Sequence, residues 1–188
     1  EAVDGARQLF GEAHPLYATY LNNLAVAYGA QGDLEAAEPL FRRLLEIRRE
    51  RLGDAHPDVA NSLGNLGRLL REKGDFAAAE EHYRGAIDVL RRGGNESHPW
   101  MSLYLENLAA LYRDQGDLAR AEPLFRQVIE LRLELLGEES PQLASALIGY
   151  GELLLVRGAP GEAEPPLARG LEVLRAALGD DHWRTAEA

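Results

Sequence analysis

The chain of 188 residues has no cysteine, one methionine and a single lysine, Lys73. Without cysteine it forms no disulfide, has no thiol nucleophile and offers no thiolate to a metal ion. Basic residues are also outnumbered, because 31 acidic residues stand against 20 basic ones and the formal net charge is −11. This acidity argues against nucleic acid as a partner.

Long apolar runs are absent as well. No segment approaches the roughly 18 uninterrupted apolar residues that span a bilayer, and no basic start precedes an apolar stretch as in a signal peptide. We therefore expect no membrane contact and a cytoplasmic location. The chain begins at Glu1 within an amphipathic stretch, which favours a fragment of a longer protein. The arginine-rich, alanine-rich composition favours a bacterium with a GC-rich genome.

The chain is rich in apolar residues, at 46%, and in glycine, with 19 residues. That glycine content is high for a helical protein. Many of the glycines recur every 42 residues, in frame with histidine, proline and alanine-glutamate pairs. The recurring positions are Pro15, Pro57, Pro99 and Pro141; His14, His56, His98 and His182; Gly32, Gly74, Gly116 and Gly158; Ala37-Glu38, Ala79-Glu80, Ala121-Glu122 and Ala163-Glu164; and Gly11, Gly53, Gly137 and Gly179, with Asn95 in the remaining slot.

Each copy has the pattern of two helices. Proline at the first helical position suits the start of the first helix, because its missing N–H costs nothing there. The apolar residues of this helix in copy one recur at spacings of 4, 3 and 4, on one helical face: Tyr17, Leu21, Leu24 and Tyr28. A Gly-Asp pair then ends that helix and caps the second. No segment alternates with the period of a strand, so the predicted fold class is all-α.

The frame predicts a single array of four complete repeats. Their predicted bounds are 14–55, 56–97, 98–139 and 140–181. Residues 1–13 are then the end of a preceding repeat, and residues 182–188 begin a fifth. Units of this kind bury their apolar faces by stacking on their neighbours.

The repeat resembles the tetratricopeptide repeat (TPR). The residues that carry the resemblance in copy one are Leu24-Ala25, Tyr28, Gly32, Ala37, Phe41 and Leu44. The 42-residue period and the start His-Pro-x-x-Ala-x-x-Leu-x-Asn-Leu-Ala are similar to the kinesin-light-chain type of the family. The resemblance implies a right-handed superhelical solenoid of antiparallel helix pairs, whose first helices line a concave groove. It is specific for the fold and less so for the function, because such arrays serve many systems.

The resemblance also implies a binding mode. In this family, peptides or partner segments lie in the groove, where asparagines pair with the peptide backbone; a side-chain amide can both donate and accept. The matching residues are Asn23, Asn65 and Asn107, whereas copy four departs from the pattern with Gly149. The alternative interpretation is that these asparagines satisfy local contacts between helices.

Periodicity adds further residues to the predicted groove, and they vary between copies: Asn22, Asn61, Leu103 and Ile148. Arg68, Arg71 and Arg113 are candidates to bind the carboxylates of an acidic partner. Carboxylates close by in the sequence are candidates to neutralise them. The four first-helix segments hold five acidic and five basic residues, so the net charge of the chain lies elsewhere.

Sharper chemical interpretations find less support. The in-frame histidines stand one repeat apart at helix starts, which favours capping over a metal site whose ligands converge within about 2 Å of the ion. Gly149-Tyr150-Gly151 lacks the remaining features of a phosphate loop, and Gly151 occupies the small-residue slot that Ala25, Gly67 and Ala109 fill in the other copies. No arrangement identifies a nucleophile. We expect no catalytic residue, no metal and no cofactor.

The leading hypothesis is a protein–protein interaction scaffold that binds a peptide or partner segment in the groove. A second hypothesis makes the chain the sensor or regulatory array of a larger bacterial signalling ATPase or protease-linked protein. A third is a self-assembling solenoid that associates through its truncated ends. The three predict different behaviour: capture of a peptide, coupling to an adjoining effector, or concentration-dependent association.

Overall fold

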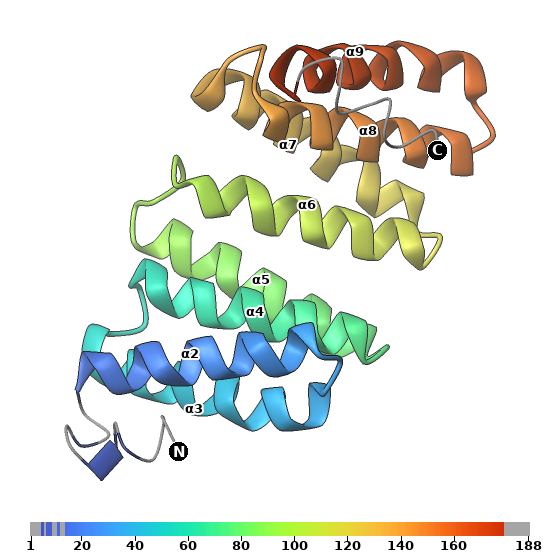
Figure 1. Cartoon of the computed structure of the whole chain (residues 1–188). Helices are drawn as coiled ribbons and strands as arrows, with labels where there is room; N and C mark the ends of the chain where they lie inside the picture. The colour runs from blue at the N-terminus through green and yellow to red at the C-terminus, as the bar shows by residue number, and fades with distance from the viewer. Residues whose placement is uncertain (1–4, 6, 9–10, 12–13, 179–188) are drawn as a thin grey trace. The chain divides into compact units, whose positions relative to one another are not determined.

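The computed structural model describes residues 14–178 and, before them, residues 5, 7, 8 and 11. Residues 14–178 form eight α-helices and contain no strand (Figure 1), which confirms the predicted fold class. The helices are α2 (Pro15–Ala30), α3 (Leu34–Leu52), α4 (Pro57–Glu72), α5 (Phe76–Arg92), α6 (Pro99–Asp114), α7 (Leu118–Leu136), α8 (Pro141–Val156) and α9 (Pro160–Leu178). The predicted fifth repeat at 182–188, and most of the predicted remnant at 1–13, lie outside the described residues.

Histidine side chains cap two of the first helices. The ring Nδ1 of His14 accepts the backbone N–H of Leu16 at 3.2 Å, and that of His56 accepts the N–H of Asp58 at 3.1 Å. Each histidine is the N-cap of a helix whose first turn holds the in-frame proline. These two rings therefore satisfy backbone donors that a helix start leaves unpaired, as the sequence predicts.

Gly-Asp pairs separate the two helices of the first three copies. Each aspartate accepts the backbone N–H three residues on at 3.1 Å, and each glycine before it has a φ between 77° and 82°. The pairs are Gly32-Asp33, Gly74-Asp75 and Gly116-Asp117. Because L side chains rarely adopt such a φ, glycine fits these turns at little cost. The high glycine content is therefore compatible with a wholly helical fold.

Copy two ends its second helix differently from copies one and three. Helix α5 ends at Arg92, and the residue with positive φ, 66°, is Gly94. The frame assigns this turn to Asn95, one residue later, whose Nδ2 donates to the carbonyl of Gly93 at 3.0 Å. The extra glycine lets the turn form one position early.

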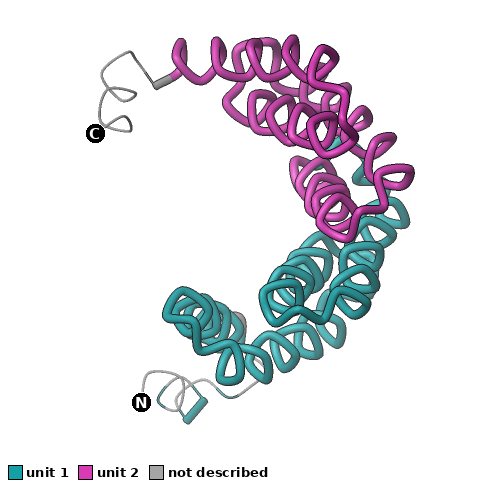
Figure 2. Tube along the Cα trace, turned by 90° about the vertical axis from the view of Figure 1, so that its right-hand side faces the viewer, with its two compact units in different colours: residues 1–98 teal, residues 99–188 magenta. Residues whose placement is uncertain are grey.

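The helices pack in consecutive pairs. Helix α2 packs on α3, α4 on α5, α6 on α7, and α8 on α9; the pairs are joined by α3 against α4 and by α7 against α8. The chain divides into two compact units, Glu1–His98 and Pro99–Ala188, with two helix pairs in each (Figure 2). The division lies within one residue of the predicted boundary between the second and third repeats.

Small residues on the first helices allow the pairs to pack closely. A Cβ on Gly67 would lie 2.8 Å from the ring of Tyr83, and one on Gly151 would lie 2.5 Å from Leu167. Ala25 and Ala109, in the same slot, are fully buried. This slot therefore has the packing role that the sequence predicts. Each large side chain buried here contributes about 1.5–3 kcal/mol to folding.

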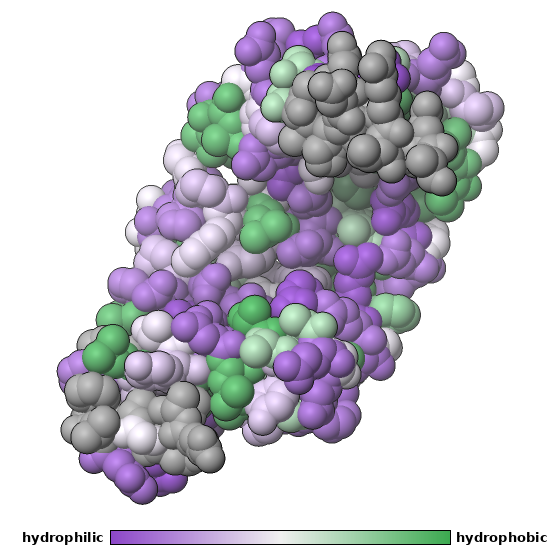
Figure 3. Space-filling view, viewed as in Figure 1, coloured by the Kyte–Doolittle hydropathy of each residue, from purple (hydrophilic) through white to green (hydrophobic). Residues whose placement is uncertain are grey.

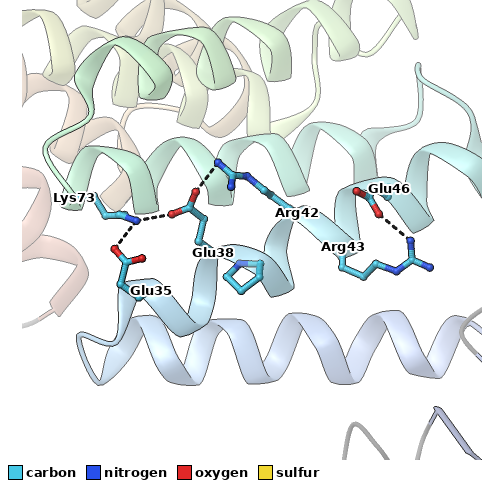
Figure 4. A pocket seen from close by; sticks show the side chains of 7 residues that line it. Glu35, Glu38, Arg42, Arg43, Glu46 and Lys73 are labelled. Atoms are coloured by element: carbon cyan, nitrogen blue, oxygen red, sulfur yellow. Dashed lines mark hydrogen bonds and ion pairs between the residues drawn. The ribbon is translucent and has the colours of Figure 1, made fainter.

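The recurring glutamate of the alanine-glutamate pair joins neighbouring helix pairs. An oxygen of Glu38 lies 2.5 Å from Lys73 Nζ in unit 1 (Figure 4), and one of Glu122 lies 2.9 Å from Arg157 Nη1 in unit 2. Both partners stand 35 residues after the glutamate. In copies one and three this glutamate thus has a structural role, which the sequence frame alone did not supply.

The described part of the face shown in Figure 3 has no large apolar area. Hydrophilic and hydrophobic side chains are interspersed on the face shown in Figure 3. Among the described residues no helix has both the length and the apolar composition for crossing a bilayer. Several of the most exposed large hydrophobic residues stand at helix ends: Leu52, Leu136, Leu155 and Val156.

Candidate functional site

We use the term first-helix face for the ten positions predicted to bind a ligand, all of which lie on α2, α4, α6 or α8. Unit 1 contributes Asn22, Asn23, Asn61, Asn65, Arg68 and Arg71, and unit 2 contributes Leu103, Asn107, Arg113 and Ile148. The two units arrange their share of this face differently.

The asparagines of α4 form a pair. Asn61 and Asn65 lie one helical turn apart, both half-buried, and Nδ2 of Asn65 lies 3.5 Å from Oδ1 of Asn61. On α2, Asn23 is exposed, while the Oδ1 of Asn22 is buried with no hydrogen-bond partner among the described residues. Within residues 14–178 no hydrogen bond joins the α2 asparagines to the α4 pair. The α4 pair is therefore the organised part of the face in unit 1.

An arginine from the second helix of the preceding pair orients this asparagine pair. Arg48 of α3 donates from Nη1 to the carbonyl of Asp58 at 3.0 Å, to Oδ1 of Asn61 at 3.0 Å and to Oγ of Ser62 at 2.8 Å. Ser62 in turn donates to the carbonyl of Asp58 at 3.2 Å. Arg48 thus reaches from α3 to the N-terminal half of α4. Sequence reasoning did not select it.

The arginines of unit 1 continue the same stripe of α4. Arg68 Nη1 lies 2.6 Å from Glu72 Oε1, and its Nη2 lies 3.9 Å from the position of a Cβ on Gly29 of α2.

The Tyr83 ring is fully buried, and its hydroxyl has no hydrogen-bond partner in the part of the chain that the structure describes. Burial raises the pKa of Tyr83 to about 12, although the charges of Arg71 and Arg68 oppose this rise. Arg68 and Arg71 therefore place two guanidinium groups at this end of α4, of which Arg68 contacts Glu72.

In unit 2 the predicted arginine is already paired. Arg113 of α6 donates from Nη1 to the carboxylate of Glu152 on α8 and lies 3.2 Å from Asp114. Its side chain is 19% exposed. Two carboxylates thus surround one guanidinium, so an acidic ligand would have to displace them.

A second ion pair in unit 2 was not predicted. Arg132 of α7, whose side chain is 5% exposed, donates to both carboxylate oxygens of Glu106 at 2.9 and 2.6 Å. The hydroxyl of Ser145 donates to the same carboxylate at 2.9 Å. A bidentate pair of this kind is strongly directional, and it neutralises the first-helix carboxylate. The signal for it was present in the sequence, because Arg48 and Arg132 stand two repeats apart in the same slot.

The other predicted residues of unit 2 have mixed surroundings. Leu103 is 39% exposed on α6, and Asn107 is half-buried. Ile148 Cγ1 lies 2.8 Å from where a Cβ on Gly170 of α9 would be, so it packs within its own helix pair. The structure does not bring these three side chains into one cluster with Arg113.

Gly149 replaces the asparagine of the other copies for a packing reason. A Cβ on this residue would lie 2.7 Å from the Phe125 ring of α7. Real Cβ atoms do not approach a ring so closely, so an asparagine here requires Phe125 or α8 to shift. The break in the asparagine series is thus a property of the packing in unit 2.

Two hollows adjoin these elements in unit 1. One of about 310 Å³ is lined by Ala18, Thr19, Ile47, Arg48, Arg51, Leu52 and Asp58. It shares Arg48 with the asparagine pair and is largely apolar. The other, of about 600 Å³, lies against α3 around Pro39 (Figure 4). Its charged side chains are engaged in ion pairs with one another, among them Arg43 with Glu46 at 2.8 Å.

Comparison with known proteins places the chain in a family. A family model described as tetratricopeptide repeat matches residues 1–50, 30–92 and 100–176. No curated protein matches the chain.

Solved structures share the fold. The structure of BtubC (BKLC) from P. vanneervenii is 24% identical, with a TM-score of 0.78, and covers 87% of this chain, which spans 65% of that one. A putative kinesin light chain of Podosopora anserina with nearly identical TPR-like repeats is 21% identical to this chain, with a TM-score of 0.75. The match covers 95% of this chain and 84% of the Podosopora anserina chain. A variant of that same protein is 22% identical to this chain, with a TM-score of 0.77. The match covers 94% of this chain and 83% of the variant's chain. From the repeats, the paired helices and the matched model together, the chain belongs to the tetratricopeptide repeat family and is an all-α TPR solenoid.

Proposed function

We propose that the chain binds a peptide or extended partner segment on its first-helix face, with the asparagine pair of α4 as the centre of the site. Tetratricopeptide repeats are in general protein–protein interaction scaffolds, which supports the class of function. The observation that carries the proposal is the stripe of α4, where Asn61, Asn65 and Arg68 follow one another at spacings of 4 and 3 residues. Amides that both donate and accept match the peptide unit of a ligand.

The same stripe favours an acidic ligand. Arg68 and Arg71 place two guanidinium groups within one turn of each other on α4. A guanidinium binds a carboxylate through two parallel hydrogen bonds. Unit 2 contributes less to such a preference, since Arg113 already lies between Asp114 and Glu152.

The proposal is tested with peptides selected from a random 12-residue library displayed on phage. The variant Asn65→Ala should weaken binding of a selected peptide by about tenfold, the loss of a hydrogen bond to the bound peptide. The melting temperature should stay within a degree or two of the unmodified chain. The matched control is Gln127→Ala, which removes an exposed amide of α7 and should leave affinity unchanged.

Two results would contradict the proposal. A loss of melting temperature in parallel with affinity would make Asn65 a packing residue. If the unmodified chain selects no peptide from the library, the proposed function is wrong. Light scattering over a range of concentrations tests the competing hypothesis of self-assembly, which predicts growth of the particles.

A further inference from the structure

We infer that Arg48 is a positioning residue, which fixes the amide of Asn61 so that its Nδ2 donates to a backbone carbonyl of the bound peptide. The inference rests on the proposed function and deepens it. It assigns a role to a residue of a second helix, α3, which does not itself lie on the first-helix face.

The orientation of the amide follows from the chemistry of its neighbour. A guanidinium has only donors, so the Asn61 atom that lies 3.0 Å from Arg48 Nη1 is the acceptor, Oδ1. The Nδ2 of Asn65, at 3.5 Å, approaches the same oxygen. With Oδ1 engaged from two sides, Nδ2 of Asn61 points away from Arg48.

Both asparagines then offer a defined group to a ligand. Among the described residues, Asn61 Nδ2 and Asn65 Oδ1 take part in no hydrogen bond, while both residues are half-buried on the same stripe of α4. One residue thus presents a donor and the next presents an acceptor, one turn along. A peptide backbone offers the complementary carbonyl and N–H, so the pair favours one direction of the bound chain.

Arg48 is held firmly enough for this role. Its Nη1 also donates to the carbonyl of Asp58 and to the hydroxyl of Ser62, at 3.0 and 2.8 Å. Both acceptors lie in the first two turns of α4. Rotation of the Asn61 amide by 180° would place an NH₂ group against the guanidinium, and this repulsion excludes the alternative orientation.

The decisive variant is Asn61→Asp. The carboxylate keeps an acceptor toward Arg48 and gains an ion pair, so the melting temperature should be unchanged or higher. It lacks the Nδ2 donor, and affinity for a peptide selected from the 12-residue library should fall about tenfold. Unchanged affinity of this variant for a peptide that the unmodified chain binds would overturn the inference while leaving the proposed function intact.

A second variant separates positioning from folding. Arg48→Met should weaken peptide binding about threefold or more, because the Asn61 amide becomes free to rotate. In that background Asn61→Asp should cost less affinity than alone, a coupling that a double-mutant cycle measures. The matched control, Arg132→Met with Glu106→Gln, removes the arginine of the same slot in unit 2. It should lower the melting temperature without changing affinity at a temperature where the chain is folded.

Nuclear magnetic resonance tests the orientation without reliance on affinity. The side-chain NH₂ signals of Asn61, assigned by their loss in Asn61→Asp, should exchange rapidly with water in the free chain and slowly once a selected peptide is bound. Slow exchange in the free chain would overturn the inference. Additive effects of Arg48→Met and Asn61→Asp on affinity would do the same.

Discussion

Units 1 and 2 place an arginine in the same slot of the repeat and use it in opposite ways. In unit 1, Arg48 donates to Oδ1 of Asn61, to the carbonyl of Asp58 and to the hydroxyl of Ser62. In unit 2, Arg132 meets the carboxylate of Glu106, which it binds in a bidentate fashion. The first arrangement leaves Nδ2 of Asn61 without a hydrogen bond among the described residues, and the second neutralises the carboxylate of Glu106. The arginine of this slot therefore hydrogen-bonds an amide in unit 1 and forms an ion pair in unit 2, and the facing residue decides which.

The largest expected effect tests this difference directly. Arg132→Met strips Glu106 of its partner in a site where the arginine side chain is 5% exposed, and should cost about 3 kcal/mol of unfolding free energy. Arg48→Met removes hydrogen bonds to Asn61, Ser62 and the carbonyl of Asp58, which are neutral acceptors, and should cost about 1–2 kcal/mol. Urea unfolding followed by circular dichroism measures both. Equal losses would show that the two networks do not differ as the contacts suggest.

Restoring the missing asparagine in unit 2 should also destabilise the chain. Gly149→Asn places a Cβ 2.7 Å from Phe125, and the resulting overpacking should cost about 2 kcal/mol. The companion change Phe125→Leu removes ring atoms from the clash, so the double variant should lose less stability than the sum of the single ones. Thermal unfolding of the unmodified chain, the two single variants and the double variant measures these losses of stability. A neutral Gly149→Asn would mean that α8 shifts easily.

The arginines of the two units should differ in their effect on an acidic peptide. Arg68→Gln with Arg71→Gln should weaken the binding of a selected peptide that contains aspartate or glutamate by about tenfold, or ~1.4 kcal/mol. Arg113→Gln should change the affinity by less than about twofold, because its guanidinium already contacts Glu152 and Asp114. Isothermal titration at two salt concentrations measures both. A larger effect at Arg113 would reverse the assignment.

The smallest effect concerns the ion pairs of Glu38 and Glu122, whose partners are Lys73 in unit 1 and Arg157 in unit 2. The hydrogen bond to Glu35, which has the larger effect, and the hydrogen bond to Glu38 raise the pKa of Lys73 above its ordinary value of 10.5. Because the folded-state pKa is raised, this stabilisation is complete below pH 10.5 and is lost as the pH rises through the folded-state value. Lys73→Arg should therefore reduce the loss of melting temperature above that pH. Identical alkaline profiles of the two proteins would exclude a contribution from this pair.

Much of the fold could be predicted from local patterns. The starts of the helices at His14 and His56 and the Gly-Asp turns follow from the chemistry of helix ends, which involves residues within a few positions of one another. The small-residue slot at Gly67 and Gly151 follows from its recurrence. These features depend on spacing within one repeat, and four copies of the repeat make the spacing visible.

The candidate site was predictable only in part. Helical periodicity predicts that Asn61, Asn65 and Arg68 share one stripe of α4, but it carries no information on which side chains of other helices contact that stripe. Arg48 and Arg132 reach first helices from second helices, and Ile148 turns toward Gly170 of its own pair. Such contacts join residues 13 to 30 positions apart in the sequence. Periodicity within one helix does not predict contacts over that separation.

By itself the sequence determined the all-α class, the helix ends and the tetratricopeptide repeat, because these depend on backbone preferences and on a period that short-range chemistry repeats. Only the tertiary structure decided which polar groups form hydrogen bonds or ion pairs within the protein. Packing brought Arg132 to Glu106 and Arg113 to Glu152, yet it set Arg48 against a neutral amide. The energy of a buried charge depends on its nearest partner in space, and that partner lies on another helix.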